Sequence, residues 1–327
     1  MERTPLADAP ALVQVVRDGF VEAVHRGHVV VADTSGVVRA SLGDPALETY
    51  PRSSLKPFQA RATADLLAQA GVELDVPATA ITCASHFGSS EQQVEAARIL
   101  ADAGLDEMDL RCPDAYPADR AAARDTPRPT RLAHNCSGKH AGFLAAQVAA
   151  GDDPAKYLDE HSRLQELAAT YIRDVCGTDL TGMGIDGCGA PAWRLALSGM
   201  ATGFARLAVA RGDDPLAPMA AAMRARPDLV GGMGRTDTQL MLSDARVVAK
   251  GGAEAFFAAG FTTAKGESLG IAVKIADAGS RAIGPTVGTI LKAYGIGVDD
   301  AVIQPVVLGG GLPHGHIIAT DAVGQLV

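Results

Sequence analysis

Short apolar stretches separated by turn residues fill the first 50 positions of the chain. They cover 13–16, 27–33 and 35–38, with glycine, aspartate and serine among the residues that flank them. This alternation predicts an antiparallel meander of strands. From Ser53 onward the apolar residues recur at helical spacing as far as Gly71, which predicts a helix that begins at Ser53.

Helical patterns dominate the middle of the chain. Ser90 and Gln93 have the spacing of a capping box, so a helix is expected to begin there and to end at Gly104. The stretch 113–131 contains four prolines and predicts an irregular surface excursion. The remaining predicted elements are helices over 139–212 with a glycine-rich interruption at 182–189, neighbouring strands at 245–250 and 270–277, and a closing helix at 286–294.

The length of 327 residues exceeds the usual size of one compact domain. We expect an α/β (α+β) fold with two lobes that share a cleft. The sheet-containing lobe would comprise about 1–60 and 230–327, and a mainly helical lobe would comprise about 61–229.

Charge and composition favour a small-molecule ligand. The net charge is −9 and the pI is near 5.3, without a basic stripe, which argues against nucleic acid and anionic membranes as partners. No window approaches 18 uninterrupted apolar residues, and no signal-like apolar stretch follows Met1. We therefore expect a cytoplasmic protein.

The five cysteines do not predict a disulfide framework, because their number is odd and the chain is long. Cys112 and Cys176 have neighbours that suggest no chemistry, so we interpret them as small buried hydrophobic residues.

Ser53 and Lys56 form a Ser-x-x-Lys pair, which places a hydroxyl beside an amine on a helix. A lysine that has lost its proton through burial can activate a serine as a nucleophile. Ser85 and His86 follow an apolar segment and are expected at a loop edge. Lys250 ends a strand before two glycines, as the lysine of a Lys-Thr-Gly element does.

Two cysteines lie among other chemically active residues. Cys136, Lys139 and His140 share one face of a helical turn, and Cys188 lies between two glycines just after Asp186. Two thiolates with a nitrogen from His140 or Lys139 would satisfy zinc. Reduced thiols lining a pocket are the alternative, because the Cys-x-x-Cys spacing of structural sites is absent.

Four further polar residues show no arrangement that differs from a solvated surface. They are Asp228, Arg235, Asp237 and Asp244.

Five segments together resemble the asparaginase II family of the thermolabile rhizobial type, in order over nearly the whole chain. The segments are Arg52-Ser53-Ser54-Leu55-Lys56-Pro57-Phe58-Gln59, Cys83-Ala84-Ser85-His86, His134-Asn135-Cys136-Ser137-Gly138-Lys139-His140-Ala141-Gly142, Gly184-Ile185-Asp186-Gly187-Cys188-Gly189 and Lys250-Gly251-Gly252-Ala253-Glu254. The resemblance implies a fold like that of serine β-lactamases and penicillin-binding proteins, with an antiparallel sheet flanked by helices. It also implies a homodimer.

The same resemblance implies roles for particular residues. Ser53 would be the nucleophile and Lys56 its base, with Ser85 and a second lysine as a companion pair. Lys250 is the expected second lysine, and Lys265 and Lys274 stay open as alternatives. The metal-capable set is Cys136, Lys139 and Cys188, and the substrate-binding set is Arg52, His86, Asn135, His140, Asp186 and Gly252.

Two positions depart from the family pattern. Phe87 follows His86 where a small polar residue is commoner, and Ala255 follows Glu254 where glycine is commoner. Both are expected to affect the shape of the pocket and so the substrate preference.

We predict hydrolysis of the side-chain amide of L-asparagine, without an organic cofactor. Backbone N–H groups near Ser53 and at Gly251 and Gly252 would hold the oxyanion, and Asp186 would bind the substrate α-ammonium. The alternatives are a β-lactamase-like or peptidase acyl-serine hydrolase, and a non-catalytic amino-acid or metal sensor.

Overall fold

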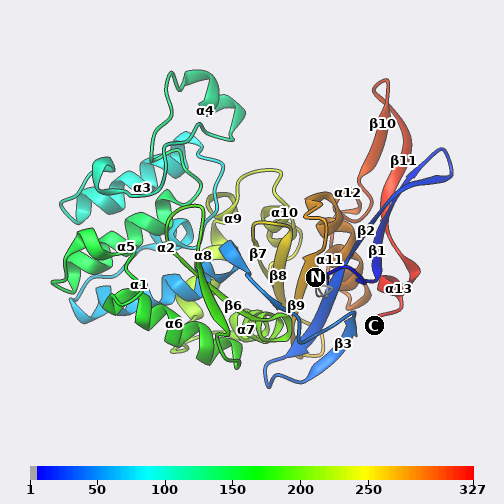
Figure 1. Cartoon of the computed structure of the whole chain (residues 1–327), viewed down its shortest axis with the longest axis horizontal. Helices are drawn as coiled ribbons and strands as arrows, with labels where there is room; N and C mark the ends of the chain where they lie inside the picture. Colours follow the sequence, from blue (N-terminus) through cyan, green and yellow to red (C-terminus); the bar gives the residue numbers. More distant parts are fainter. Residues whose placement is uncertain (1–5) are drawn as a thin grey trace.

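An antiparallel sheet forms one half of the molecule in the computed structural model, which describes residues 6–327 (Figure 1). Within these residues the sheet has eight strands in the order β10-β11-β1-β2-β9-β8-β7, and β3 pairs with β2. The strands are β1 (Ala11–Arg17), β2 (Phe20–Asp33), β3 (Val38–Leu42), β7 (Val247–Gly251), β8 (Phe256–Thr262), β9 (Ser268–Ile275), β10 (Val306–Gly309) and β11 (Leu312–Ala319).

Helices cover the middle of this sheet. Every residue of β9 is buried, because α7 (Leu197–Val209) and α11 (Ile283–Ala293) both pack against this strand. Gly260 and Gly270 allow α7 to lie directly on the sheet, since a Cβ at either position would overlap backbone atoms of the helix.

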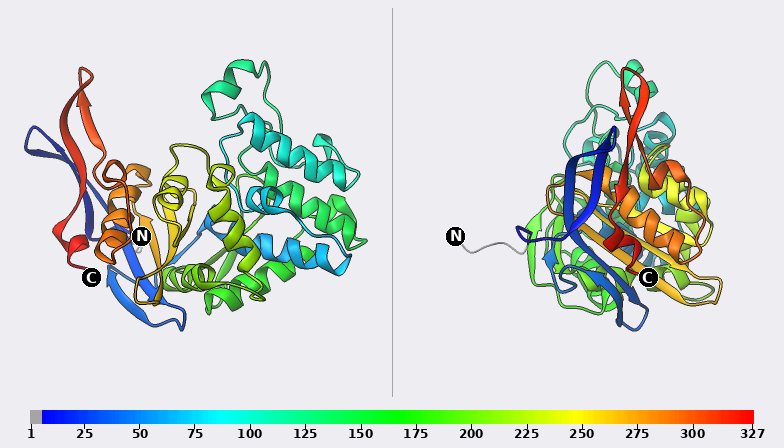
Figure 2. Two further views of the ribbon diagram at one scale, coloured as in Figure 1. Left: turned by 180° about the vertical axis from the view of Figure 1, so that it is seen from behind. Right: turned by 90° about the vertical axis from the view of Figure 1, so that its right-hand side faces the viewer.

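The other half of the molecule is mainly helical (Figures 1 and 2). Its helices pack through apolar faces, α1 against α5 and α6, and α3 against α5. They are α1 (Lys56–Gln69), α2 (Val76–Thr82), α3 (Ser90–Asp102), α4 (Arg120–Asp125), α5 (Ser137–Ala149), α6 (Arg163–Cys176), α8 (Ala217–Ala225) and α9 (Pro227–Val230). The predicted fold class, an antiparallel sheet with flanking helices and a mainly helical lobe, is confirmed.

Smaller elements complete the chain. A three-stranded sheet has the order β4-β6-β5. The remaining elements are β4 (Glu48–Thr49), β5 (Gly182–Ile185), β6 (Pro191–Ala196), α10 (Thr236–Ser243), α12 (Asp300–Ile303), α13 (Asp321–Gly324), and the 3-10 turns η1 (Arg52–Leu55), η2 (Glu107–Asp109), η3 (Pro154–Lys156) and η4 (Ser280–Ala282).

The tips of two hairpins, β1–β2 and β10–β11, project beyond the other strands of the sheet in Figures 1 and 2. Several of their large apolar side chains are exposed, among them Phe20 at 75% and Leu312 at 66%. No helix within residues 6–327 combines the length and the apolar character needed to cross a bilayer.

The structure confirms several predicted elements and corrects others. The N-terminal meander is β1 to β3, and the helix predicted from Ser53 begins as η1 and continues as α1 to Gln69. The predicted strands at 245–250 and 270–277 are not neighbours, because β8 lies between β7 and β9. The stretch 113–131 contains the short helix α4, which the prolines did not suggest.

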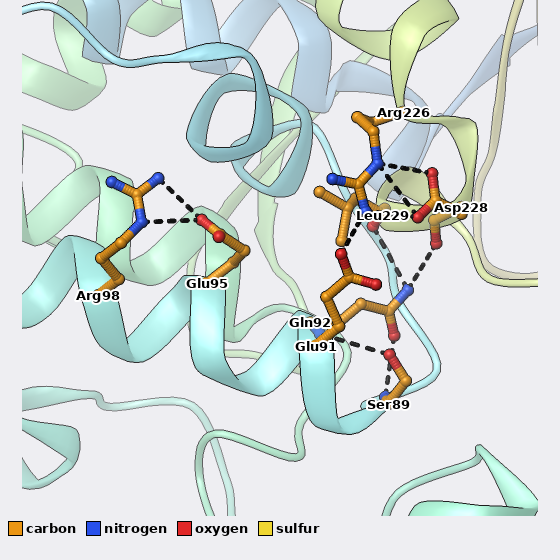
Figure 3. Close-up of polar contacts among 8 residues, drawn as sticks. All are labelled: Ser89, Glu91, Gln92, Glu95, Arg98, Arg226, Asp228 and Leu229. Carbon is orange, nitrogen blue, oxygen red and sulfur yellow. Dashed lines mark hydrogen bonds and ion pairs between the residues drawn. The ribbon is translucent and has the colours of Figure 1, made fainter.

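The capping box of α3 is formed by Ser89 and Gln92, one residue earlier than predicted (Figure 3). Gln92 also donates to the backbone oxygen of Asp228 at 2.8 Å. Arg226 contacts both Glu91 and Asp228. These contacts fasten the segment 226–230 to α3, and that segment leads into a wall of the cleft described next.

Candidate active site

A cleft of about 720 Å³ contains both serines that the sequence singled out. Ser53 lies at the start of the α1 region, Ser85 follows α2, and Asn135 precedes α5. The opposite wall is formed by 251–257 after β7, with 234–237 at the start of α10 and 278–283 before α11. The cleft therefore gathers residues from six separate parts of the chain.

The residues that flank Ser53, the candidate nucleophile, are held against the end of β7. The buried Ser54 donates from Oγ to the backbone oxygen of Lys250 at 2.7 Å. A Cβ at Gly252 would overlap the backbone oxygen of Pro51, so the two strands of chain lie in direct contact. Ser53 itself is half-buried and faces the cleft, and its Oγ forms no hydrogen bond within residues 6–327.

Unusual backbone conformations gather at this cleft. Four of the five described non-glycine residues with positive φ lie in it or next to it: Arg52 (φ +54), Glu254 (φ +55), Ala255 (φ +49) and Ala278 (φ +57). Such conformations cost roughly 1–3 kcal/mol each and persist where surrounding contacts impose them. Arg52 is held by Asp186, which accepts from its Nε at 2.9 Å and from its Nη2 at 2.5 Å.

Lys56 is 1% exposed and donates to three acceptors. These are the backbone oxygen of Ala84, Ser85 Oγ at 3.0 Å and Cys136 Sγ at 3.2 Å. No hydrogen bond joins Lys56 to Ser53 Oγ in the described part of the chain. The Lys56 amine therefore contacts Ser85, whereas the Ser-x-x-Lys spacing predicts a contact with Ser53.

Lys250 is 0% exposed and lies beneath the cleft wall. Its Nζ contacts Asp237 Oδ2 at 3.4 Å and donates to the backbone oxygen of Gly251 at 2.8 Å. Burial lowers the pKa of Lys250 to about 8, and the Asp237 carboxylate limits the fall. Asp237 also accepts from Gly251 N at 3.0 Å, so this one carboxylate orders both the lysine and the strand end.

The two alternative lysines occupy different surroundings. Lys265 lies in the exposed turn between β8 and β9. Lys274 is on β9, where its Nζ donates to the backbone oxygens of Glu254 and Ile275. Neither residue lines the cleft, whereas Lys250 precedes the two glycines that do.

Cys136 and Cys188 lie beside two buried amines. Lys139 Nζ is 3.3 Å from Cys188 Sγ, and Lys56 Nζ contacts Cys136. A hydrogen bond from Cys188, together with both lysines, holds the pKa of Cys136 well below its usual range, while the same hydrogen bond raises the pKa of Cys188. The pair thus has the character of one thiolate and one thiol.

A buried nitrogen lies next to these sulfurs. His140 Nδ1 contacts Tyr157 Oη at 2.7 Å, and its Nε2 is buried without a hydrogen-bond partner. Burial lowers the pKa of His140 to about 4, so the imidazole is neutral. Two sulfurs with Lys139 or His140 as nitrogen donor match the ligands that zinc prefers. Within residues 6–327 no group of three or more His, Cys, Asp or Glu side chains could hold a metal ion, so His140 does not complete a site with the two cysteines and the Lys139 amine would be the third ligand.

Two other predicted residues, His86 and Asp186, lie outside the lining of the cleft. His86 is buried and points away from the cleft, because its Nδ1 accepts from Gly88 N and its Nε2 contacts Ser137 Oγ at 3.0 Å. Asp186 does not line the cleft, and its Oδ1 accepts from Arg52 and Gly187. All five cysteines are buried, and none of them forms a disulfide in the described residues.

Sequence reasoning missed Ser54, Asp237 and Arg235. Ser54 lies inside the Arg-Ser-Ser-Leu-Lys motif, so its position beside Ser53 was an available signal. Asp237 and Arg235 have no such signal in the sequence, because they enter the cleft through the packing of α10 against β7.

A family model described as L-asparaginase II matches residues 13–317, nearly the whole chain. Because the match covers nearly the whole chain, the chain belongs to the L-asparaginase II family.

Among solved structures the chain is similar to Mglu in its native form, with a TM-score of 0.42 and 14% identity over 84% of this chain and 64% of that chain. It is also similar to Bacillus glutaminase in 4.3 M NaCl, with a TM-score of 0.40 and 12% identity over 90% of this chain and 94% of that chain. The chain thus spans less than two thirds of the length of Mglu. A search of curated proteins gives no match.

Proposed function

We propose that this amidohydrolase is an L-asparaginase in which Ser53 is the nucleophile. The observation that carries the proposal is the cleft that brings Ser53, Ser85 and Asn135 together with the strand end after Lys250. Ser53 Oγ attacks the side-chain amide carbon, ammonia leaves, and water then releases L-aspartate from the acyl-serine. Family membership supports an enzyme in place of the sensor alternative.

The oxyanion needs backbone N–H groups that are free of other partners. Those of Gly251 and Gly252, which the sequence suggested, already donate to Asp237 and to the backbone oxygen of Phe256. We therefore assign the oxyanion to the N–H groups of Ser53 and Ala253. The first N–H groups of a helix lack partners within it, and Ala253 N donates to no backbone oxygen in residues 6–327. Removing one such donor typically costs about 10²- to 10³-fold in kcat.

Proton transfer follows the observed contact of Lys56 with Ser85. Ser85 Oγ lies 3.0 Å from Lys56 Nζ, so Ser85 takes the proton of Ser53 as it gives its own to the neutral Lys56 amine, and the same path returns a proton to the leaving ammonia. Lys250, behind the wall formed by 251–257, is proposed as a second proton donor in its ammonium form. Its lowered pKa of about 8 makes it a better acid than an ordinary lysine near neutral pH.

Asp186 and Asn135 are proposed to orient the substrate. Asp186 lies outside the cleft lining but binds Arg52, the neighbour of Ser53, and its Oδ2 accepts none of the hydrogen bonds that occupy Oδ1, so we assign Oδ2 to the substrate α-ammonium group. Asn135 lines the cleft and offers both donors and an acceptor to the amide.

Cys136, Lys139 and Cys188 are proposed to hold zinc, with His140 beside them. The bound ion would supply a fixed positive charge that orders these side chains near Asp186. Elemental analysis checks the assignment: one zinc per chain is expected, and its loss in Cys188→Ser but not in Cys176→Ser. An equal zinc content in the two variants would contradict it.

The family resemblance also supports a homodimer, and the exposed apolar hairpins are suited to a protein interface. Light scattering is expected to give twice the mass of one chain, and a monomeric mass would contradict it.

The nucleophile is tested by replacing Ser53 with alanine. Ammonia release from L-asparagine should fall by about 10⁴-fold or more, as it does when other serine nucleophiles are removed. Ser90→Ala, at an exposed position on α3, serves as the control. Assays should include glutamine and β-aspartyl compounds to define the amide that is turned over.

Ser85→Ala separates the two serines. If Ser53→Ala keeps activity and Ser85→Ala loses it, Ser85 is the nucleophile and the assignment of Ser53 is wrong. Undiminished activity in both variants would exclude a serine mechanism.

A further inference from the structure

Arg235 lines the same cleft as Ser53 and Ser85, and it interacts with the Asp237 carboxylate only at a distance, without an ion pair. The side chain is half-buried at the N-terminal end of α10. Within residues 6–327 its guanidinium donates no hydrogen bond and forms no ion pair. The guanidinium instead lies over the ring of Phe87, whose centroid is 5.1 Å from Arg235 Cζ.

The platform under the guanidinium is rigidly held. Phe87 N donates to the backbone oxygen of Gly231 at 3.1 Å, and Asp119 N donates to that of Phe87 at 2.9 Å. A Cβ at Gly232 would overlap the Phe87 ring, so only glycine lets the ring lie here. The contacts of Gln92 and Arg226 anchor the preceding segment to α3 (Figure 3). Stacking on an aromatic face orients a guanidinium without using its N–H groups.

Neighbouring charges do not satisfy Arg235. The Asp237 carboxylate is occupied by Lys250, Gly251 N and Thr238 N. Arg281, the other arginine of the cleft, is exposed and donates from Nε to His25. Arg281 keeps free Nη groups but is exposed and lies on no aromatic ring, whereas Arg235 is half-buried, stacks on Phe87 and has its whole guanidinium free of hydrogen bonds.

We propose that Arg235 binds the α-carboxylate of the amino-acid substrate, with Phe87 as its platform. The proposal rests on the function proposed above and adds to it the selection of substrates with a free α-carboxylate. A guanidinium and a carboxylate form two parallel N–H···O bonds, which are among the stronger hydrogen bonds in proteins. An esterified carboxyl group lacks the charge and therefore loses this contact.

The test compares L-asparagine with L-asparagine α-methyl ester, by ammonia release. In the wild type, kcat/KM should favour the free acid. In Arg235→Met, kcat/KM for the free acid should fall by about 10- to 100-fold, which is the usual effect of losing a charged hydrogen bond. The value for the ester should change by less than about threefold, so that the preference disappears.

Two variants make the comparison specific. Arg235→Lys keeps the charge without the fork and should recover part of the preference for the acid. Arg281→Met removes the other arginine of the cleft and should change both substrates by the same factor. An equal change for both substrates in Arg235→Met would overturn the proposal.

Calorimetric binding of L-aspartate separates this proposal from the proposed reaction, because binding needs no turnover. Wild-type protein should bind L-aspartate more tightly than its α-methyl ester, and Arg235→Met should lose the difference. If the wild type binds in this way but hydrolyses no amide, the proposed function fails and the carboxylate site stands. If aspartate does not bind, or binds equally to Arg235→Met, the carboxylate site is wrong.

Discussion

Lys250 and Lys274 are both buried lysines of the central sheet, with exposed fractions of 0% and 8%, yet they occupy different chemical surroundings. Lys250 faces the Asp237 carboxylate at the strand end that forms the cleft wall. Lys274 donates to two backbone oxygens, one of them from the strained residue Glu254. Burial lowers the pKa of both lysines. The partner and the access to the cleft, rather than burial, distinguish a proton donor from a structural support.

The largest expected effect in this comparison is the loss of Lys250. Lys250→Met should lower kcat by about 10²- to 10⁴-fold, the usual contribution of a general acid. Lys274→Met should keep kcat within about threefold and instead lower the free energy of unfolding by about 1–3 kcal/mol, because the backbone oxygens of Glu254 and Ile275 lose their donor. Steady-state kinetics and urea unfolding of the two variants measure these effects.

Lys250→Met also leaves Asp237 as an uncompensated buried charge, which could destabilise the fold by about 3–5 kcal/mol. The double variant Lys250→Met, Asp237→Asn removes that charge and serves as the control. If the double variant is folded and fully active, Lys250 has no catalytic role. If Lys274→Met loses kcat as strongly as Lys250→Met, the distinction between the lysines fails.

A smaller effect is expected on the pH profile when Asp237 is neutralised. As a proton donor, Lys250 must be charged, so wild-type kcat should fall as the pH rises through about 8. Asp237 raises the pKa of Lys250, while Arg235 and Lys56 lower it. In Asp237→Asn the pKa should therefore fall, and the alkaline limb should move to lower pH by about one unit or more. Profiles of kcat from acid to alkaline pH measure the shift, and an unmoved limb would contradict the coupling.

The smallest effect concerns the loop that Lys274 supports. Ala255 has a φ of +49°, a conformation that costs a non-glycine residue roughly 1–2 kcal/mol. Ala255→Gly removes this strain but costs about 0.5–1 kcal/mol in chain entropy. The net result should be a gain of about 0.5–1 kcal/mol in the free energy of unfolding. Urea unfolding should show it, and Ala253→Gly, at a position without positive φ, should show no gain.

Local patterns predicted the elements whose signal lies within a few residues. The helix at Ser53 and the N-terminal meander are of this kind. Strand β8 was missed because Phe256–Thr262 contains two alanines and a glycine, which have low strand propensity, and packing against α7 decides its conformation. The capping box was placed one residue late because Ser89 and Ser90 are both suitable caps, and the contact of Gln92 with Asp228 selects the first.

The site divides in the same way. Ser53, Lys56, Ser85 and Cys136 stand in short motifs, and the structure brings them together. The bond from Lys56 to Ser85 could not be predicted from the spacing, because it depends on where the turn after α2 passes the helix. Asp237 and Arg235 precede Lys250 by 13 and 15 residues, and only the packing of α10 against β7 brings them into the cleft.

The contact between Gly252 and Pro51, with the bond from Ser54 to Lys250, makes the serine-bearing turn and the end of β7 a single mechanical unit. Heat or denaturant cannot loosen one side of the catalytic centre while the other stays in place. Loss of turnover on heating should therefore coincide with melting of the whole sheet, so enzyme activity itself would report the global stability of this protein.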